Sequence, residues 1–220
     1  MATKFSEITA AEMRAAMIDS QLRTNDVIDP AVIGAMAAAP REAHVPAALA
    51  GVAYMDRPIA LGHGRALNAP LVTGRMLVAA AIRPGQRVLL VGSATGYTAG
   101  LLALLGAEVH AVEEQAELMA AAQGAVTKDN IRWTRGPLAA GAPDAAPFDR
   151  IIIEGAIETL PDTLVAQLAD GGRLIAARRE GAVTRLVQGV KTGETIALRS
   201  FADMDVAPLP GFGAPASFRF

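Results

Sequence analysis

Apolar residues along this chain follow two alternating patterns, and the alternation predicts the fold. Five short segments predict strands, and the first, at 87–91, is an apolar run with no polar alternation, as expected for a strand that is buried on both faces. These segments lie at 87–91, 108–112, 130–134, 149–153 and 173–177. Between them, helical spacing predicts helices over 97–105, 114–123 and 159–168. Strands that alternate with helices predict a doubly wound, mostly parallel α/β sheet.

The two ends of the chain add further elements to this core. Helices are predicted before it, over 9–24, 31–39 and 70–82. Thr9 and Glu12 have the spacing of a capping box, and Asp29 with Pro30 is typical of a helix start. After the last parallel strand, an antiparallel edge hairpin is predicted over 185–191 and 194–201. The proline- and glycine-rich tail from Ala207 predicts no regular structure.

A long irregular segment, 41–68, separates the second predicted helix from the third. Pro46, Pro58, Gly62 and Gly64 interrupt any long element there. Loops of this length inside a compact domain are more often functional than idle. We therefore expect this segment to contribute to a site.

Composition narrows the class of protein. The chain has 220 residues, a net charge of −2 and no cysteine. The near-neutral charge argues against a broad nucleic-acid surface, and the lack of cysteine excludes disulfides and thiolate metal sites. Neither a signal peptide nor a membrane-spanning run is recognisable, so we expect a cytoplasmic protein that binds no membrane. Histidine spacing indicates no metal site.

The turn after the first core strand predicts a nucleotide-like ligand. Gly92 and Gly96 let the backbone turn sharply and let a ligand approach it closely. Glu113 ends the next strand about 20 residues later, where an acidic residue accepts hydrogen bonds from both ribose hydroxyls. Ala94 and Tyr97 break the dinucleotide pattern G-x-G-x-x-G, so the turn more closely resembles the G-x-G-x-G turn of S-adenosylmethionine-dependent methyltransferases. Ordinary strand–helix packing, with Glu113 as a plain strand-end carboxylate, is the alternative.

Several further stretches together resemble one family, the protein-L-isoaspartate (D-aspartate) O-methyltransferases. In chain order they are Pro40-Arg41-Glu42, Val45-Pro46, Ala53-Tyr54-Met55-Asp56, Leu61-Gly62-His63-Gly64, Asn68-Ala69-Pro70, Arg87 to Tyr97, Val112-Glu113, Pro147 to Ile152, Gln167-Leu168 and Gly171 to Leu174. Their order and spacing are more specific than any single motif, and they span roughly residues 17–178.

The resemblance implies a fold, a cofactor and a reaction. The fold is a Rossmann-like doubly wound sheet of about seven strands, with an N-terminal helical segment and an antiparallel edge hairpin. The cofactor is S-adenosyl-L-methionine, with S-adenosyl-L-homocysteine as product. The reaction methylates the carboxylate of L-isoaspartyl or D-aspartyl residues in damaged proteins, which is a protein-repair activity. The implied partners are isoaspartyl proteins or peptides, and we expect a monomer or weak dimer.

Several positions depart from the family pattern where the chemistry is expected. The family's loop serine aligns with Asn68, and the Gln-Thr pair before it aligns with Arg65 and Ala66. The Gly-Asp-Gly segment that lines the adenine pocket aligns with Gly136-Pro137-Leu138. The cofactor-binding residues implied by the resemblance are Leu67, Leu90, Gly92, Ser93, Ala94, Gly96, Glu113, Glu114, Pro137 and Leu138.

Asn68 and Arg65 are the two residues predicted to act on the substrate. A carboxylate with a pKa near 3.9 is already ionised at pH 7, so the enzyme mainly aligns the reacting groups and excludes water. Asn68 can donate a hydrogen bond to that carboxylate, or it can simply cap the helix that starts at Pro70. Arg65 can hold the carboxylate in bidentate geometry, or it can be a solvated loop residue.

Two functions and one division of the chain follow. The first function is the methyltransferase itself, and the second is a divergent homologue that binds the cofactor or a protein partner with altered or lost catalysis. The predicted division is 1–69 for the N-terminal helices and substrate-side loop, 70–206 for the Rossmann-like core, and 207–220 for the irregular tail.

Overall fold

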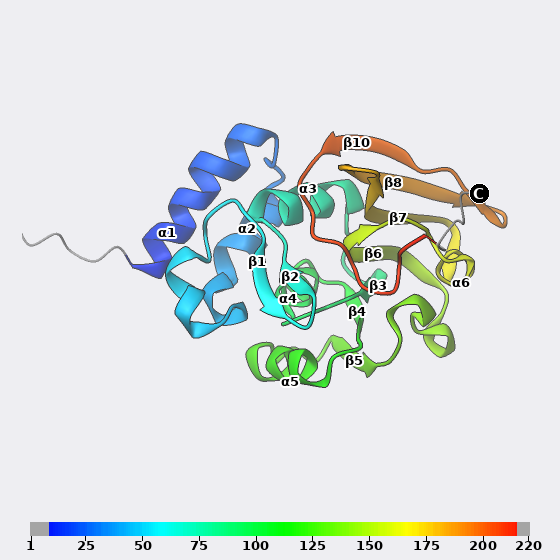
Figure 1. Cartoon of the computed structure of the whole chain (residues 1–220), viewed down its shortest axis with the longest axis horizontal. Coiled ribbons are helices and arrows are strands. Elements are labelled where there is room, and N and C mark those ends of the chain that lie inside the picture. The colour runs from blue at the N-terminus through cyan, green and yellow to red at the C-terminus, as the bar shows by residue number, and fades with distance from the viewer. Residues whose placement is uncertain (1–8, 215–220) are drawn as a thin grey trace, which may run out of the picture.

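Five parallel strands, which extend to one edge of the main sheet, form most of it in the computed structural model, which describes residues 9–214 (Figure 1). The strand order is β10-β8-β7-β6-β3-β4-β5, and β9 pairs with β8. The parallel strands are β3 (Arg87–Val91), β4 (Glu108–Glu113), β5 (Ile131–Arg135), β6 (Phe148–Ile157) and β7 (Leu168–Glu180). The antiparallel ones are β8 (Val183–Thr192), β9 (Thr195–Ile196) and β10 (Arg199–Asp203). This arrangement confirms the predicted fold class.

The sheet is covered on both faces, and the central strand explains why its sequence is continuously apolar. Val88 and Leu90 of β3 pack into one hydrophobic core together with α2, α3 and α4. Leu89 and Val91 point to the opposite face and pack with α6 and the end of the chain. A strand with a core on each side has no solvent-facing positions for polar residues. The helices are α2 (Pro30–Ala38), α3 (Pro70–Ala80), α4 (Tyr97–Leu104), α5 (Ala116–Ala125) and α6 (Asp162–Ala166).

The N-terminal helix begins where its cap predicts and then changes geometry. Helix α1 (Ala10–Met17) starts after Thr9, whose side chain and that of Glu12 form both hydrogen bonds of the capping box. The predicted single helix over 9–24 continues instead as a π-helical turn (Ile18–Leu22) and a 3-10 turn (Arg23–Asn25). Asp29 caps α2 through Ala31 N and Val32 N, as predicted.

The long loop before α3 contains short regular elements. Two 3-10 turns, Arg41–His44 and Ala47–Val52, precede an antiparallel hairpin of β1 (Ile59–Gly62) and β2 (Arg65–Leu67). This two-stranded ribbon does not join the main sheet. Its turn has three consecutive residues with positive φ, from Gly62 to Gly64. The ribbon is therefore a separate arm, and it places Arg65 at the start of its second strand.

Two predicted elements differ in the structure. The helix expected over 159–168 is reduced to α6, because Pro161 precedes its start and Leu168 already belongs to β7. The antiparallel edge hairpin expected over 185–191 and 194–201 is confirmed, because β8 pairs with β7 from Val183 to Val190, but its second strand is divided into β9 and β10, which pair with different parts of β8. Pro161 is a local signal in the sequence, whereas the division of the second hairpin strand depends on pairing between strands, which local patterns do not encode.

Of the predicted irregular tail, residues 207–214 form no helix or named strand, as predicted, but make an isolated bridge to β6 at Pro208, and residues 215–220 lie outside the described chain. Ala156 N donates to Ala207 O and Leu209 N donates to Ala156 O, both at 2.8 Å. Leu209 and Phe212 are buried. In Figure 1 this red segment crosses the region where β6 and β3 end. The tail therefore covers the carboxyl edge of the parallel strands, where ligands of such sheets bind.

Candidate functional site

The two glycines of the turn after β3, Gly92 and Gly96, lie in different surroundings. Gly92 and Gly96 both have positive φ, and Ala94 between them also adopts the left-handed region at φ 48°. A Cβ on Gly96 would lie 2.9 Å from Ala122 Cβ, so this glycine allows the start of α4 to pack against α5. A Cβ on Gly92 would lie 2.8 Å from Nη2 of Arg65. Only Gly92 therefore faces the expected ligand crevice.

Glu113 is buried at the end of β4 and accepts hydrogen bonds on both oxygens. Ala94 N donates to Oε2 at 2.7 Å. Glu114 N and Gln115 N donate to Oε1 at 3.0 and 3.1 Å. The side chain has 0% exposure. Backbone N–H groups thus fix the carboxylate at the position predicted for a ribose acceptor.

Arg65 is buried against this same carboxylate. Its Nη1 lies 2.8 Å from Oε1 and 2.7 Å from Oε2 of Glu113, and its Nη2 donates to Gly92 O at 2.7 Å. The Arg65 side chain is 3% exposed. It is therefore not a solvated loop arginine, because it bridges the ends of β3 and β4 from the β1–β2 arm.

Asn68 lies in the loop between β2 and α3 and contacts a second buried carboxylate, that of Glu154 near the carboxyl end of β6. Its Nδ2 donates to Oε2 of Glu154 at 3.3 Å, and Thr98 Oγ1 donates to Oε1 at 2.9 Å. Asn68 does not cap α3, whose N-cap residue Ala69 makes no side-chain cap bond. Burial raises the pKa of Glu154, although the Thr98 hydrogen bond and the nearby Arg65 charge lower it in part.

Arg41 is buried beside this region and bonds the backbone of the loop that leads into α3. Its Nε donates to Ala53 O at 2.6 Å and its Nη2 to Asn68 O, so it fixes the backbone of the loop that carries Asn68. The guanidinium carbon lies 5.1 Å from the ring centre of Tyr97. Arg41 Nη1 and the Tyr97 hydroxyl have no hydrogen-bond partner within residues 9–214. Sequence analysis missed both Arg41 and Glu154 as members of the site.

One signal in the sequence pointed to Glu154. It follows the apolar run 149–153 directly, just as Glu113 follows 108–112. Carboxyl ends of parallel strands meet at one edge, so two charged residues in this register are expected close together. Arg41 gave no comparable signal, because buried arginines are rare and are placed by tertiary contacts.

The other predicted cofactor residues fall into three groups. Leu67, Leu90 and Leu138 are buried apolar side chains. Glu114 and Pro137 are exposed. Ser93 is buried at 4%, and its hydroxyl has no hydrogen-bond partner within the described chain. Their roles toward a cofactor stay predictions, and Ser93 alone presents an unused polar atom at the turn.

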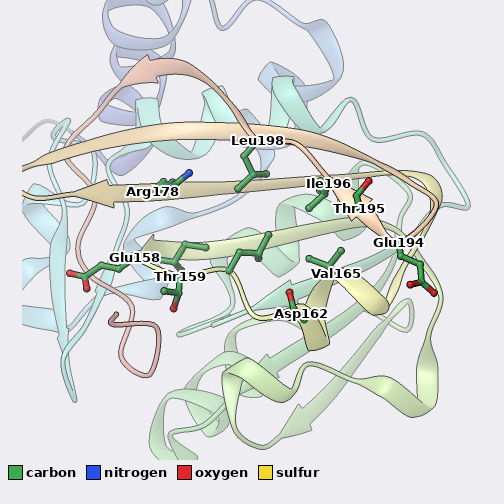
Figure 2. A pocket seen from close by; sticks show the side chains of 11 residues that line it. Glu158, Thr159, Asp162, Val165, Arg178, Glu194, Thr195, Ile196 and Leu198 are labelled. Atoms are coloured by element: carbon green, nitrogen blue, oxygen red, sulfur yellow. The ribbon is translucent and has the colours of Figure 1, made fainter. Parts of the chain in front are cut away.

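An open pocket of about 570 Å³ lies away from the glycine turn. Figure 2 shows Glu158 and Thr159 after β6, Asp162 and Val165 on α6, and Glu194 near the β8–β9 turn.

Across residues 9–214, no group of three or more histidine, aspartate or glutamate side chains is arranged to hold a metal ion. None of the helices in that range has the length and apolarity to cross a membrane.

Comparison with known proteins identifies the family. The family model described as Protein-L-isoaspartate(D-aspartate) O-methyltransferase (PCMT) matches residues 12–209. A protein-L-isoaspartate O-methyltransferase of Methylorubrum extorquens (strain PA1) is 44% identical over 75% of this chain and 73% of its own length. One from Methylorubrum populi is 38% identical over 91% of this chain and 97% of its own length.

A solved structure has the same fold. A putative protein-L-isoaspartate O-methyltransferase from Plasmodium falciparum, in complex with S-adenosyl-L-homocysteine, superposes with a TM-score of 0.79 at 21% identity. The match covers 92% of this chain and 99% of that one. The fold, the conserved order of segments and the extent of the family match agree: this chain belongs to the protein-L-isoaspartate (D-aspartate) O-methyltransferase family.

Proposed function

We propose that this chain is an S-adenosylmethionine-dependent O-methyltransferase that methylates the carboxylate of L-isoaspartyl or D-aspartyl residues in damaged proteins. The family match over residues 12–209 carries this proposal. The strand–turn–helix unit that ends in the buried Glu113 agrees with it.

The residues around the turn suit a nucleoside cofactor. Glu113 would accept the ribose hydroxyls, Gly92 leaves space for close approach, and the unpartnered Ser93 hydroxyl offers one further polar contact. The cofactor supplies an electrophilic methyl group on a sulfonium. Arg65 shares this space, and the consequence is developed below.

The side chains of this protein have to position a nucleophile that is already charged. An isoaspartyl carboxylate needs no general base at neutral pH, so alignment and exclusion of water provide most of the catalysis. We propose that Asn68 donates an amide hydrogen to this carboxylate, because it lies at the edge of the sheet beside Glu154. We assign no substrate contact to Arg65, whose guanidinium bonds Glu113.

The experiment is a methyl-transfer assay with two peptides. They have the same sequence and differ only in an isoaspartyl or a normal aspartyl residue. We expect label from S-adenosylmethionine to enter the isoaspartyl peptide as a base-labile ester and not the aspartyl peptide. Incorporation into neither peptide at saturating cofactor, or equally into both, would contradict the proposed function.

The finer assignments are proposals as well. We propose that residues 1–69 form the substrate side, 70–206 the methyltransferase core and 207–220 a tail. We also propose a cytoplasmic monomer or weak dimer that acts on isoaspartyl proteins. Sedimentation of the purified chain would measure its oligomeric state, and cell fractionation its location.

A further inference from the structure

Glu113 has no acceptor position left for a ribose. A carboxylate offers about four lone-pair sites. Three backbone N–H groups and Arg65 Nη1, which contacts both oxygens, use these sites. The carboxylate is also fully buried. In this arrangement the acceptor expected to hold the nucleoside already holds an internal side chain.

The guanidinium also occupies the space left by the glycine turn. Nη2 donates to Gly92 O, and it lies where a Cβ on Gly92 would make contact at 2.8 Å. Leu209 of the tail covers the same glycine, with its Cδ1 at 3.2 Å from that Cβ position. A ligand cannot approach the Gly92 backbone while both side chains remain there.

We propose that Arg65 is a built-in competitor of the cofactor, so that the nucleoside binds Glu113 only after the Arg65 guanidinium has left it. This inference rests on the proposed function, because it concerns the same site. Its consequence is a reduced affinity, since the apparent dissociation constant is the intrinsic one divided by the fraction of molecules with the site open.

The segment that carries Arg65 is not hydrogen-bonded to the main sheet. Among the described residues, β1 and β2 pair only with each other, and their register is irregular between Ala60 and Gly62. Ile59 and Leu67 anchor the two strands in the core beside β3, whereas Arg65 lies at the turn end of the arm. This turn lies close to the tail, because a Cβ on Gly64 would lie 3.5 Å from Pro210 Cγ. Displacement of Arg65 therefore requires no change in the pairing of the core strands.

Glu154 offers the displaced guanidinium a second carboxylate. It is buried near the carboxyl end of β6, beside Asn68, and the charge of Arg65 acts on it in the closed arrangement. Thr98 and Asn68 supply only one hydrogen bond to each of its oxygens. Its remaining lone pairs can accept Arg65, which keeps the cation paired when Glu113 receives the ligand.

The test compares the affinity for S-adenosylhomocysteine by titration calorimetry. Arg65→Gln keeps a polar side chain but cannot form the buried ion pair. We expect it to bind at least tenfold more tightly than the unmodified chain. Arg150→Gln is the matched control, because Arg150 donates to Ala80 O and Asp149 O and contacts neither Glu113 nor Gly92. Its affinity is expected to stay within twofold.

A second variant keeps the test decisive if Arg65→Gln does not fold, as judged by circular dichroism. Arg65→Lys retains the charge but cannot contact Glu113 and Gly92 O together with a forked group. We expect it to bind between threefold and tenfold more tightly than the unmodified chain. If the folded variants bind equally or more weakly, the competitor role is wrong.

The outcomes separate this inference from the proposed function. Methyl transfer by the unmodified chain, together with unchanged affinity in the Arg65 variants, overturns only the competitor role. Tighter binding in the variants without methyl transfer to the isoaspartyl peptide supports the competitor role and overturns the proposed function. If neither the unmodified chain nor any variant binds S-adenosylhomocysteine, both are wrong.

Discussion

Two buried glutamates at the same edge of the sheet have opposite surroundings. Glu113 at the end of β4 accepts three backbone N–H bonds and a contact from Arg65 Nη1 to both of its oxygens. Glu154 near the carboxyl end of β6 accepts one hydroxyl and one amide bond, the latter at 3.3 Å. Burial raises the pKa of Glu154 because this smaller donor set does not offset desolvation.

The difference shows how the backbone can supply hydrogen bonds to a buried carboxylate. The turn after β3 and the start of α5 direct N–H groups at Glu113, so the backbone itself compensates the charge. No backbone N–H contacts the Glu154 carboxylate in the described chain, and its partners are side chains from α4 and the Asn68 loop. Similar positions in a sheet therefore receive very different sets of hydrogen-bond donors, and the pKa of Glu154 is raised where that set is small.

The largest expected effect follows from removing the charge at Glu113. Glu113→Gln would place an amide NH₂ against backbone N–H donors and remove the carboxylate that the buried Arg65 contacts. We expect a loss of about 3–5 kcal/mol in the free energy of unfolding, measured by urea denaturation. Glu114→Gln, at the exposed neighbouring position, should change it by less than about 0.5 kcal/mol. Equal effects of both variants would contradict the stabilising role of the contacts to the Glu113 carboxylate.

The next prediction concerns Leu209 of the tail, which covers the glycine turn. Leu209 is 4% exposed and packs on Gly92 and Gly155. Leu209→Ala is expected to cost about 3 kcal/mol, because it leaves a cavity in a packed region. Leu104→Ala, at a leucine that is 40% exposed, should cost clearly less. Thermal denaturation of both variants measures the difference, and a similar cost would mean that the tail is not tightly packed.

A smaller effect is expected where Glu154 loses a donor. Thr98→Val keeps the shape of the side chain but removes the 2.9 Å hydrogen bond. We expect it to cost about 1–2 kcal/mol at pH 8 and to raise the pKa of Glu154 further. Thr73→Val is the matched control, since the buried Thr73 hydroxyl has no partner within residues 9–214. Thr73→Val should be neutral or slightly stabilising. If it lost as much stability as Thr98→Val, the hydrogen bond from Thr98 to Glu154 would not explain the cost of Thr98→Val.

The smallest effect is a pH dependence. Because the folded pKa of Glu154 lies above the ordinary value of 4.5, the folded state binds this proton more tightly than the unfolded chain. The resulting stabilisation is fully present below pH 4.5 and is lost as the pH rises through the folded pKa. Relative to the unmodified chain, Glu154→Gln should gain about 1 kcal/mol of stability between pH 4 and pH 8. Parallel pH profiles of the two proteins would contradict the raised pKa.

Local pattern predicted most of the fold. Strand β3 was predicted with both of its bounds, and the caps at Thr9 and Asp29 start their helices as their spacing indicated. These features depend on neighbouring residues only. The start of β7 at Leu168 and the division of the second hairpin strand into β9 and β10 were not predictable in this way, because partners distant in the sequence determine them.

The candidate site likewise has a part that local sequence predicts and a part that it does not. The sequence determined the glycine turn and the acidic residue at the end of the next strand, because both follow from the order of residues in one strand–helix–strand unit. Only the tertiary structure decided which side chains contact the turn and the acidic residue. Arg65 lies 48 residues before Glu113 in the sequence, and Leu209 belongs to the C-terminal tail. The physical reason is that a buried carboxylate has to be compensated. The nearest compensating cation in space is distant in the sequence.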